Sequence, residues 1–253
     1  MIQYLIVCPL MFLAGLVDAI AGGGGLISLP AYIIAGVPAH AAIATNKLAS
    51  SMGTTISTGR YLKNGYLKGR QMAKIAACAV VAALIGSNIG SRLSMMASES
   101  LLKNMMIVVL PIVAFYVLRN RNMGDVAGKE PLSDGVTLII ATVAALVIGT
   151  YDGFYGPGTG TFLLLVLTGL ARMDVREASA LTKVINLSSN ISALVMFIIH
   201  GAVVYQLGLA AGVFCIAGHY LGSGLVVHNG QRIVRPVILV VLGLLFVKII
   251  TGN

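Results

Sequence analysis

The chain has 253 residues, of which 58% are hydrophobic and only 10% are charged, and its formal net charge is +9. Soluble domains have about 45–50% apolar and about 25% charged residues, so this composition excludes a soluble globular protein. It also excludes a disordered chain, which needs low hydrophobicity and high charge. The sequence therefore predicts an all-α, polytopic membrane protein whose surface is covered largely by the lipid bilayer.

Most of the Lys and Arg residues lie in short loops between apolar runs. This pattern sets the orientation of a membrane protein, so the positive charge does not predict a nucleic-acid partner. The cysteines (Cys8, Cys78 and Cys215) lie inside apolar runs, with no CxxC pair and no His/Cys cluster at metal-binding spacing. We therefore expect no metal site and no cofactor.

A spanning helix needs about 20 apolar residues, and the chain contains two series of candidate segments. The first series is 3–20, 26–37, 41–62, 71–93 and 101–119, and the second is 136–154, 160–171, 178–200, 203–227 and 233–251. The expected organisation is a first membrane repeat (1–119), a polar linker (120–135) and a second membrane repeat (136–253), with about eight to ten membrane segments. The second member of each series is short and follows a glycine cluster.

Matching sequence blocks indicate that the two halves are homologous. Four blocks recur in the same order: Gly15–Gly24 with Gly149–Gly158, Asn46-Lys47 with Thr182-Lys183, Asn64-Gly65 with His200-Gly201, and Gly86–Leu93 with Gly218–Leu225. The offsets between them drift only from 132 to 136 residues. Chance rarely produces four matches in order, so we interpret the chain as two repeats.

Loop charges predict how the repeats are oriented. The loop from Arg60 to Lys74 is strongly basic, whereas its counterpart, 200–208, has no Lys or Arg. Conversely, 36–42 has none, while its counterpart carries Arg172 and Arg176. By the positive-inside rule, corresponding loops face opposite sides of the membrane. This predicts an inverted-topology repeat, a common plan of secondary transporters.

Two glycine-rich breaks are candidates for a substrate site. Their residues are Gly22, Gly23, Gly24 and Gly25 in the first repeat, and Gly156, Gly158, Thr159 and Gly160 in the second. In hydrocarbon such backbone must be buried in protein or line a cavity. Each break precedes a short helix, whose free N–H groups and positive dipole end favour an anion. Neither break matches a Walker A loop or a dinucleotide fingerprint.

Alternatively, the glycines only permit close helix packing. Gly24 and Gly158 are equivalent residues at the centres of the two breaks. If the backbone there approaches an anion closely, we expect positive φ values at both positions.

Asp18 and Asp152 each lie four residues before their glycine cluster. A carboxylate inside a membrane segment is costly and is a functional candidate, here for holding a proton or a coupling cation such as sodium. Alternatively, each carboxylate caps a broken helix by accepting hydrogen bonds from freed amides. The two roles are compatible with each other.

Lys47 and Lys183 occupy equivalent places, several residues into long apolar segments. Polar side chains near them predict a polar face inside the bundle that would bind substrate: Asn46, Thr182, Asn186 and Asn190. The lysines would then direct positive charge into the cavity. The alternative is that they snorkel to the membrane interface.

The motifs that begin at Gly15 (G-x-x-D-x-x-x-G-G-G-G-L-I-S-L-P), Ala44 (A-T-N-K) and Gly156 (G-P-G-T-G) resemble the TauE/SafE (TSUP) family of sulfite exporters. The resemblance covers nearly the whole chain. It implies a multi-pass carrier of the prokaryotic inner membrane for sulfur-containing anions, such as sulfite or organosulfonates, with about eight helices and no enzymatic activity.

The sequence as a whole favours a secondary transporter that exports a small sulfur-containing anion by alternating access between the repeats. The expected partners are that anion, the lipid bilayer and a coupling ion, either a proton or sodium; a homodimer is compatible with the sequence. A passive anion channel is the alternative. An intramembrane aspartyl protease using Asp18 and Asp152 is less favoured, because the GxGD half of its signature is absent.

Overall fold

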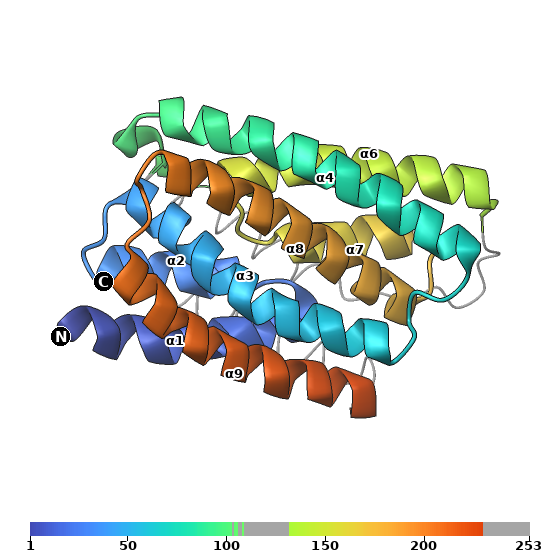
Figure 1. The fold of residues 1–253 in the computed structure, drawn as a ribbon, viewed down its shortest axis with the longest axis horizontal. Helices are drawn as coiled ribbons and strands as arrows, with labels where there is room; N and C mark the ends of the chain where they lie inside the picture. Colours follow the sequence, from blue (N-terminus) through green and yellow to red (C-terminus); the bar gives the residue numbers. More distant parts are fainter. Residues whose placement is uncertain (103, 106–107, 109–131, 230–253) are drawn as a thin grey trace.

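The computed structural model describes residues 1–102, 104–105, 108 and 132–229, and all regular structure within these ranges is helical. The helices are α1 (Ile2–Ala21), α2 (Gly25–Ile34), α3 (Ala39–Lys63), α4 (Arg70–Met96), α6 (Asp134–Phe154), α7 (Thr159–Gly169), α8 (Val175–Ile199) and α9 (Tyr205–Asn229). They form an elongated bundle (Figure 1). The expected segment 233–251, most of 101–119 and most of the polar linker lie outside the described residues.

The all-α membrane prediction is confirmed. Within the described ranges, five helices are long and apolar enough to cross a membrane: α1, α4, α6, α8 and α9. The short members of each series appear as α2, with 10 residues, and α7, with 11. The remaining helix, α3, has 25 residues but is much more polar, and its polar side chains are buried in the bundle.

Large apolar side chains point outward from the long helices. Ile85 of α4, Ile139 of α6 and Val213 of α9 are 52%, 63% and 61% exposed. Apolar faces of this extent would be unstable in water but are satisfied by lipid. The solvent for the outer surface of this protein is therefore the bilayer.

The outer helices form two matched pairs. Helix α4 packs along α6, and α1 packs along α9 (Figure 1). Small residues permit both contacts: a Cβ on Gly86 would lie 2.3 Å from the Leu146 carbonyl oxygen, and a Cβ on Gly218 would lie 2.2 Å from that of Phe12. The repeated GxxxG block thus has the same packing role in both halves, which is to bring a helix of one half against a helix of the other.

The polar helices α3 and α8 lie inside the bundle and contact each other. In Figure 1, α3 runs from left to right, whereas α8 runs from right to left. The turn between α3 and α4 and the turn between α8 and α9 lie at opposite ends of the bundle. This arrangement supports the proposal that the two halves have opposite orientations.

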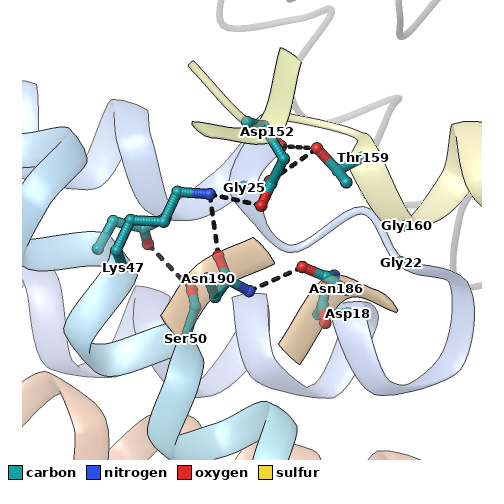
Figure 2. Close-up of a pocket in the computed structure, with 12 residues that line it drawn as sticks. Asp18, Gly22, Gly25, Lys47, Ser50, Asp152, Thr159, Gly160, Asn186 and Asn190 are labelled. Atoms are coloured by element: carbon teal, nitrogen blue, oxygen red, sulfur yellow. Dashed lines mark hydrogen bonds and ion pairs between the residues drawn. The ribbon is translucent and has the colours of Figure 1, made fainter. Parts of the chain in front are cut away.

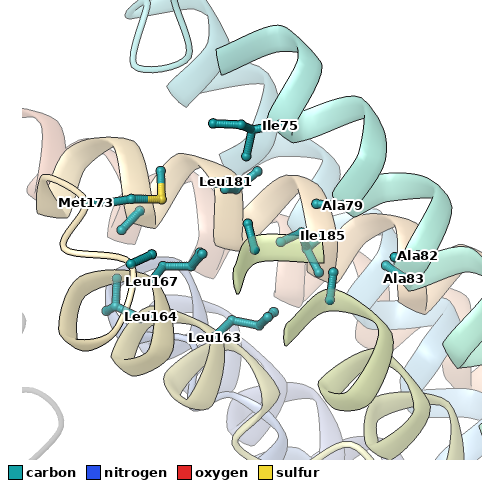
Figure 3. Close-up of a cluster of buried hydrophobic side chains, with 14 residues drawn as sticks. Ile75, Ala79, Ala82, Ala83, Leu163, Leu164, Leu167, Met173, Leu181 and Ile185 are labelled. Atoms are coloured by element: carbon teal, nitrogen blue, oxygen red, sulfur yellow. The ribbon is translucent and has the colours of Figure 1, made fainter. Parts of the chain in front are cut away.

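A cluster of buried apolar side chains packs α7 against its neighbouring helices (Figure 3). Leu163 and Leu167 of α7 are fully buried with Ala79 of α4 and with Leu181 and Ile185 of α8. Alanines on α4 keep the helices close together. The start of α7 is therefore held rigidly, and it is this end that faces the site.

The interior helices α3 and α8 begin at acidic caps. The Asp174 carboxylate accepts a hydrogen bond of 2.8 Å from the Arg176 amide at the start of α8. Glu99 accepts hydrogen bonds from the backbone amides of Ala39 and His40 at the start of α3. Burial would raise the pKa of Glu99, but these hydrogen bonds hold it below its usual value. Both polar helices are thus fixed at their first turn.

Candidate functional site

The site lies where α1 and α6 end and the two glycine-rich breaks begin. Helix α1 ends at Gly22, whose φ is +76° and whose amide donates to the Asp18 carbonyl oxygen. Gly156 and Gly158 have φ values of +97° and +81°, as expected for glycine in the left-handed region. The expectation of positive φ at Gly24 is wrong, because Gly24 has φ −56° and already follows the helical course of α2.

The two breaks cross each other with their backbones in contact. A Cβ on Gly22 would lie 2.3 Å from the carbonyl carbon of Gly160, and a Cβ on Gly160 would lie 2.5 Å from the Gly22 Cα. The Thr161 hydroxyl also donates a 3.0 Å hydrogen bond to the Ala21 carbonyl oxygen. At Gly22 and Gly160, close packing is therefore one role of the glycines.

The first ion pair joins Lys47 of α3 to Asp152 of α6 at 2.8 Å, with side chains only 2% and 3% exposed (Figure 2). Lys47 also donates to the Asn190 side-chain oxygen at 2.9 Å. The Asp152 carboxylate accepts two further hydrogen bonds, from the hydroxyls of Thr159 at 2.8 Å and Ser189 at 2.6 Å. Every oxygen of this carboxylate is thus engaged.

The second ion pair joins Lys183 of α8 to Asp18 of α1, again at 2.8 Å. Lys183 also donates to the Asp18 carbonyl oxygen at the end of α1. The other carboxylate oxygen accepts a 3.2 Å hydrogen bond from the Gly24 amide. The Asp18 side chain is 13% exposed, and the His219 Nε2 atom lies 3.6 Å from it.

The ion pairs cross between the halves: each lysine pairs with the aspartate of the other repeat. Lys47 and Lys183 therefore do not snorkel, since both ammonium groups are buried and paired. The two positive charges of this site are balanced by two negative ones. An incoming anion must compete with an internal carboxylate for a lysine, unless that carboxylate is neutralised.

A small polar pocket lies beside the Lys47–Asp152 pair and receives residues from both halves (Figure 2). Its lining consists of Asp18, Gly22, Gly25, Asn46, Lys47, Ser50, Asp152, Gly156, Thr159, Gly160, Asn186 and Asn190. The internal volume is about 20 Å³, and one water molecule needs at least about 10–15 Å³. The pocket must widen to hold an oxyanion.

Several of the expected site residues do not line this pocket. They are Gly23, Gly24, Gly158, Thr182 and Lys183. Gly24 acts through its amide on Asp18, and Gly158 precedes the first residue of α7. The buried Thr182 hydroxyl has no hydrogen-bond partner among the residues that the structure describes.

Some amides at the glycine-rich breaks are already engaged. The Gly22 and Gly24 amides donate to Asp18, the Leu26 amide donates to the Gly23 carbonyl oxygen, and the Thr159 amide donates to that of Gly156. The amides of Gly25 and Gly160, which line the pocket, donate to no other described residue, so an anion would meet them together with the side chains of Lys47 and Asn190.

Sequence reasoning missed His219 at Asp18. Ser189, the hydroxyl at Asp152, belongs to the polar stretch around Lys183 that the sequence indicates, because it follows Asn186 by three residues and shares its helix face. His219 carried no such signal, since it lies in an apolar stretch of α9 and reaches Asp18 only through tertiary packing. Among the described residues, no group of three or more His, Cys, Asp or Glu side chains could hold a metal ion.

Similar proteins are named as transporters. A probable membrane transporter protein, ORF9, of Sinorhizobium sp is 34% identical over 91% of this chain and 85% of its own length. A probable membrane transporter protein of Haemophilus influenzae is 30% identical over 94% of this chain and 91% of its own. The probable membrane transporter protein YfcA of Escherichia coli K12 is 31% identical over 94% of this chain and 86% of its own length.

No solved structure matches the chain significantly. The profile of the family described as "Sulfite exporter TauE/SafE" matches residues 7–249. These relatives are transporters rather than enzymes, and the long apolar helices make this protein a multi-pass membrane protein. The chain therefore belongs to the TauE/SafE family of membrane transporters.

Proposed function

We propose that this protein is a secondary transporter that exports small sulfur-containing anions, such as sulfite or organosulfonates, across the prokaryotic inner membrane. The observation that carries the proposal is the crossed pairing of Lys47 with Asp152 and of Lys183 with Asp18 around a pocket lined by both halves. Intramembrane ionisable residues that face one another at such a place are typical of a transport pathway.

The anion site of this proposal is the Lys47 end of the pocket. The Lys47 ammonium and the side-chain amides of Asn190 and Asn186 form a connected chain of hydrogen bonds, from Lys47 to Asn190 at 2.9 Å and from Asn190 to Asn186 at 2.7 Å. A sulfonate or sulfite oxygen would accept a hydrogen bond from the Lys47 ammonium, which has three donors and uses two of them on Asp152 and Asn190. Charge-assisted hydrogen bonds of this kind are strong in a site that excludes water.

The halves would supply alternating access by moving against each other. The pocket is lined by α3 and the first break on one side and by α8 and the second break on the other, so a change in their separation opens it. The sequence carries no ATP-binding motif, and an ion or substrate gradient therefore drives export in this proposal. The coupling ion is a proton carried at the aspartates, with sodium as the alternative.

Binding and exchange by the purified protein test this proposal. A ligand that binds only the folded state raises the melting temperature with its concentration. We expect sulfite or an organosulfonate to do so, and acetate at the same concentration to do so much less. In liposomes, unlabelled anion inside should accelerate uptake of labelled anion. Conduction without such exchange would favour a channel, and the absence of any shift would contradict the proposed substrate class.

A further inference from the structure

The two ion pairs occupy equivalent positions but have different neighbours. At Asp152, the Ser189 hydroxyl donates to the carboxylate, and the Ser87 hydroxyl in turn donates to the Ser189 carbonyl oxygen. In the other half, the positions equivalent to Ser189 and Ser87 are Gly53 and His219. A titratable imidazole thus stands beside one aspartate and not beside the other.

The glycine makes the room that the imidazole fills. A Cβ on Gly53 would lie 2.4 Å from the His219 Cδ2 atom, so no larger residue fits there without displacing the ring. His219 is only 1% exposed, and its Nε2 atom lies 3.6 Å from the Asp18 carboxylate. The pair Gly53 and His219 therefore builds a specific imidazole position against Asp18.

Ser57 holds the His219 ring from its other nitrogen. The Ser57 hydroxyl lies 3.0 Å from His219 Nδ1 and 3.1 Å from the Thr54 carbonyl oxygen. Nδ1 is therefore engaged by an uncharged hydroxyl, while Nε2 faces the Asp18 carboxylate. A proton gained by this pair of groups would be stabilised by the contact between the imidazole and the carboxylate.

Other charged groups near His219 are already paired. From α8, Lys183 binds Asp18 directly. From α3, Arg60 donates to the Tyr220 carbonyl oxygen and the Ser223 hydroxyl, one turn beyond Ser57. On α9 itself, one turn before His219, Cys215 is a buried free thiol. The Asp18 carboxylate is therefore the acidic group that His219 faces directly.

We propose, resting on the proposed function, that Asp18 and His219 are the proton site of this transporter, and that together they take up one proton when an anion binds at Lys47. Without an anion, both ion pairs are neutral, and an added proton would leave an uncompensated buried charge, which is costly. With a monovalent anion in the pocket, the same proton restores neutrality. Each ligand thus favours the other by linkage, so anion and proton cross together as a neutral pair and the outward gradient of the anion drives export.

Asp152 cannot serve in the same way. Its oxygens are engaged by Lys47, Thr159 and Ser189, and its side chain is 3% exposed, whereas Asp18 is 13% exposed and lines the pocket. A proton from the pocket can therefore reach Asp18 while Asp152 keeps its hydrogen bonds. The Lys47–Asp152 pair holds the anion, and Asp18 with His219 compensates its charge.

Calorimetry of the full-length protein tests this inference. Methanesulfonate is the probe because it carries no titratable proton near neutral pH. Titrations at pH 7 in two buffers with different ionisation enthalpies give the number of protons taken up per bound anion. We expect about one for the natural protein and about zero for His219→Gln, which should still bind the anion, more weakly. His200→Gln, an equal change at an exposed helix end, should behave like the natural protein.

The outcomes separate the inference from the proposed function. Binding by the natural protein without proton uptake overturns the inference alone, and so does unchanged uptake in a folded His219→Gln variant. The natural protein decides the first point even if the variant fails to fold. If neither methanesulfonate nor sulfate binds between pH 5.5 and 8, the proposed function fails, and the proton linkage fails with it.

Discussion

The Lys47–Asp152 and Lys183–Asp18 pairs share a distance of 2.8 Å but differ in how completely they are enclosed. Asp152 is saturated by hydroxyl groups, whereas Asp18 is bound by one amide and faces an imidazole. Homologous halves thus place the same charges in equivalent positions and then give them different chemistry through a few neighbours. The repeats are therefore symmetric in architecture but not in the roles of their ion pairs.

Removing each lysine should give the largest losses of stability, and the two losses should differ. Lys47→Met should lower the free energy of unfolding by about 3–5 kcal/mol, because it leaves the Asp152 carboxylate buried without a counter-charge. Lys183→Met should cost less, about 1–3 kcal/mol, because Asp18 is partly exposed and His219 can supply a replacement charge. Denaturant unfolding in detergent micelles measures both.

The paired substitution provides the control for that prediction. Lys47→Met combined with Asp152→Leu removes both charges, and it should recover a substantial part of the stability lost in Lys47→Met alone. Equal losses for Lys47→Met and Lys183→Met, or the reverse order, would contradict the difference between the two pairs.

The equivalent glycines Gly22 and Gly156 should respond differently to a methyl group. Both have positive φ, which costs an alanine about 1–2 kcal/mol. Gly22→Ala should cost about 1–3 kcal/mol more, because its Cβ meets the rigid backbone of Gly160 at 2.3 Å. The Cβ of Gly156→Ala would instead meet the ion pair itself, 3.0 Å from Asp152 Oδ1 and 3.1 Å from Lys47 Nζ, at distances that small shifts of these side chains can relieve.

Gly156→Ala should therefore weaken anion binding more than it lowers stability, while Gly22→Ala should mainly lower stability. Melting temperature and the anion-induced shift, measured on the same samples, separate the two effects. Gly169→Ala is the matched control, because no atom lies within 4 Å of its added Cβ. Identical behaviour of the Gly22 and Gly156 variants would argue against a special role of the second break.

Replacing Gly53 and His219 at the Asp18 site by the serines found at the equivalent positions of the Asp152 site should have a smaller effect. Gly53→Ser alone should destabilise by about 1–3 kcal/mol, because its Cβ would lie 2.4 Å from the His219 ring. Adding His219→Ser removes that clash and should recover part of the loss, although Cys215 Sγ remains 2.6 Å from the new Cβ. A double-mutant cycle measures this coupling.

The same double variant should bind methanesulfonate without taking up a proton, since it has two sites of the Asp152 kind. Additive stability effects of the two changes would mean that Gly53 and His219 do not depend on each other. Persistent proton uptake would show that the asymmetry between the sites lies elsewhere.

Cysteine labelling, which should perturb the protein least, tests the orientation of the two halves in the membrane. Single cysteines at Asn64 and Gln206, in a variant without Cys8, Cys78 and Cys215, should leave stability nearly unchanged, because both positions are exposed. A membrane-impermeant thiol reagent should label Asn64→Cys from the cytoplasmic side and Gln206→Cys from the other side. Labelling of both from one side would contradict the inverted repeat.

Much of the fold could be predicted from the sequence, because the determining features are local. Apolar runs of about 20 residues specify membrane helices. Glycine clusters specify the two breaks, and the short runs after them specify α2 and α7. The charged candidates Asp18, Lys47, Asp152 and Lys183 could be found for the same reason, since an ionisable residue is conspicuous in an apolar segment.

Only the tertiary structure decided which of these groups meet. Lys183 and Asp18 are 165 residues apart in sequence, and their contact depends on how α8 packs against the end of α1. The crossing of Gly22 with Gly160 and the placement of His219 beside Asp18 likewise depend on the approach of elements from different halves. Periodicity within a helix defines its polar face but contains no information on the partner of that face. The charges were therefore visible in the sequence, whereas their pairing, and the chemistry that distinguishes the two pairs, came from packing.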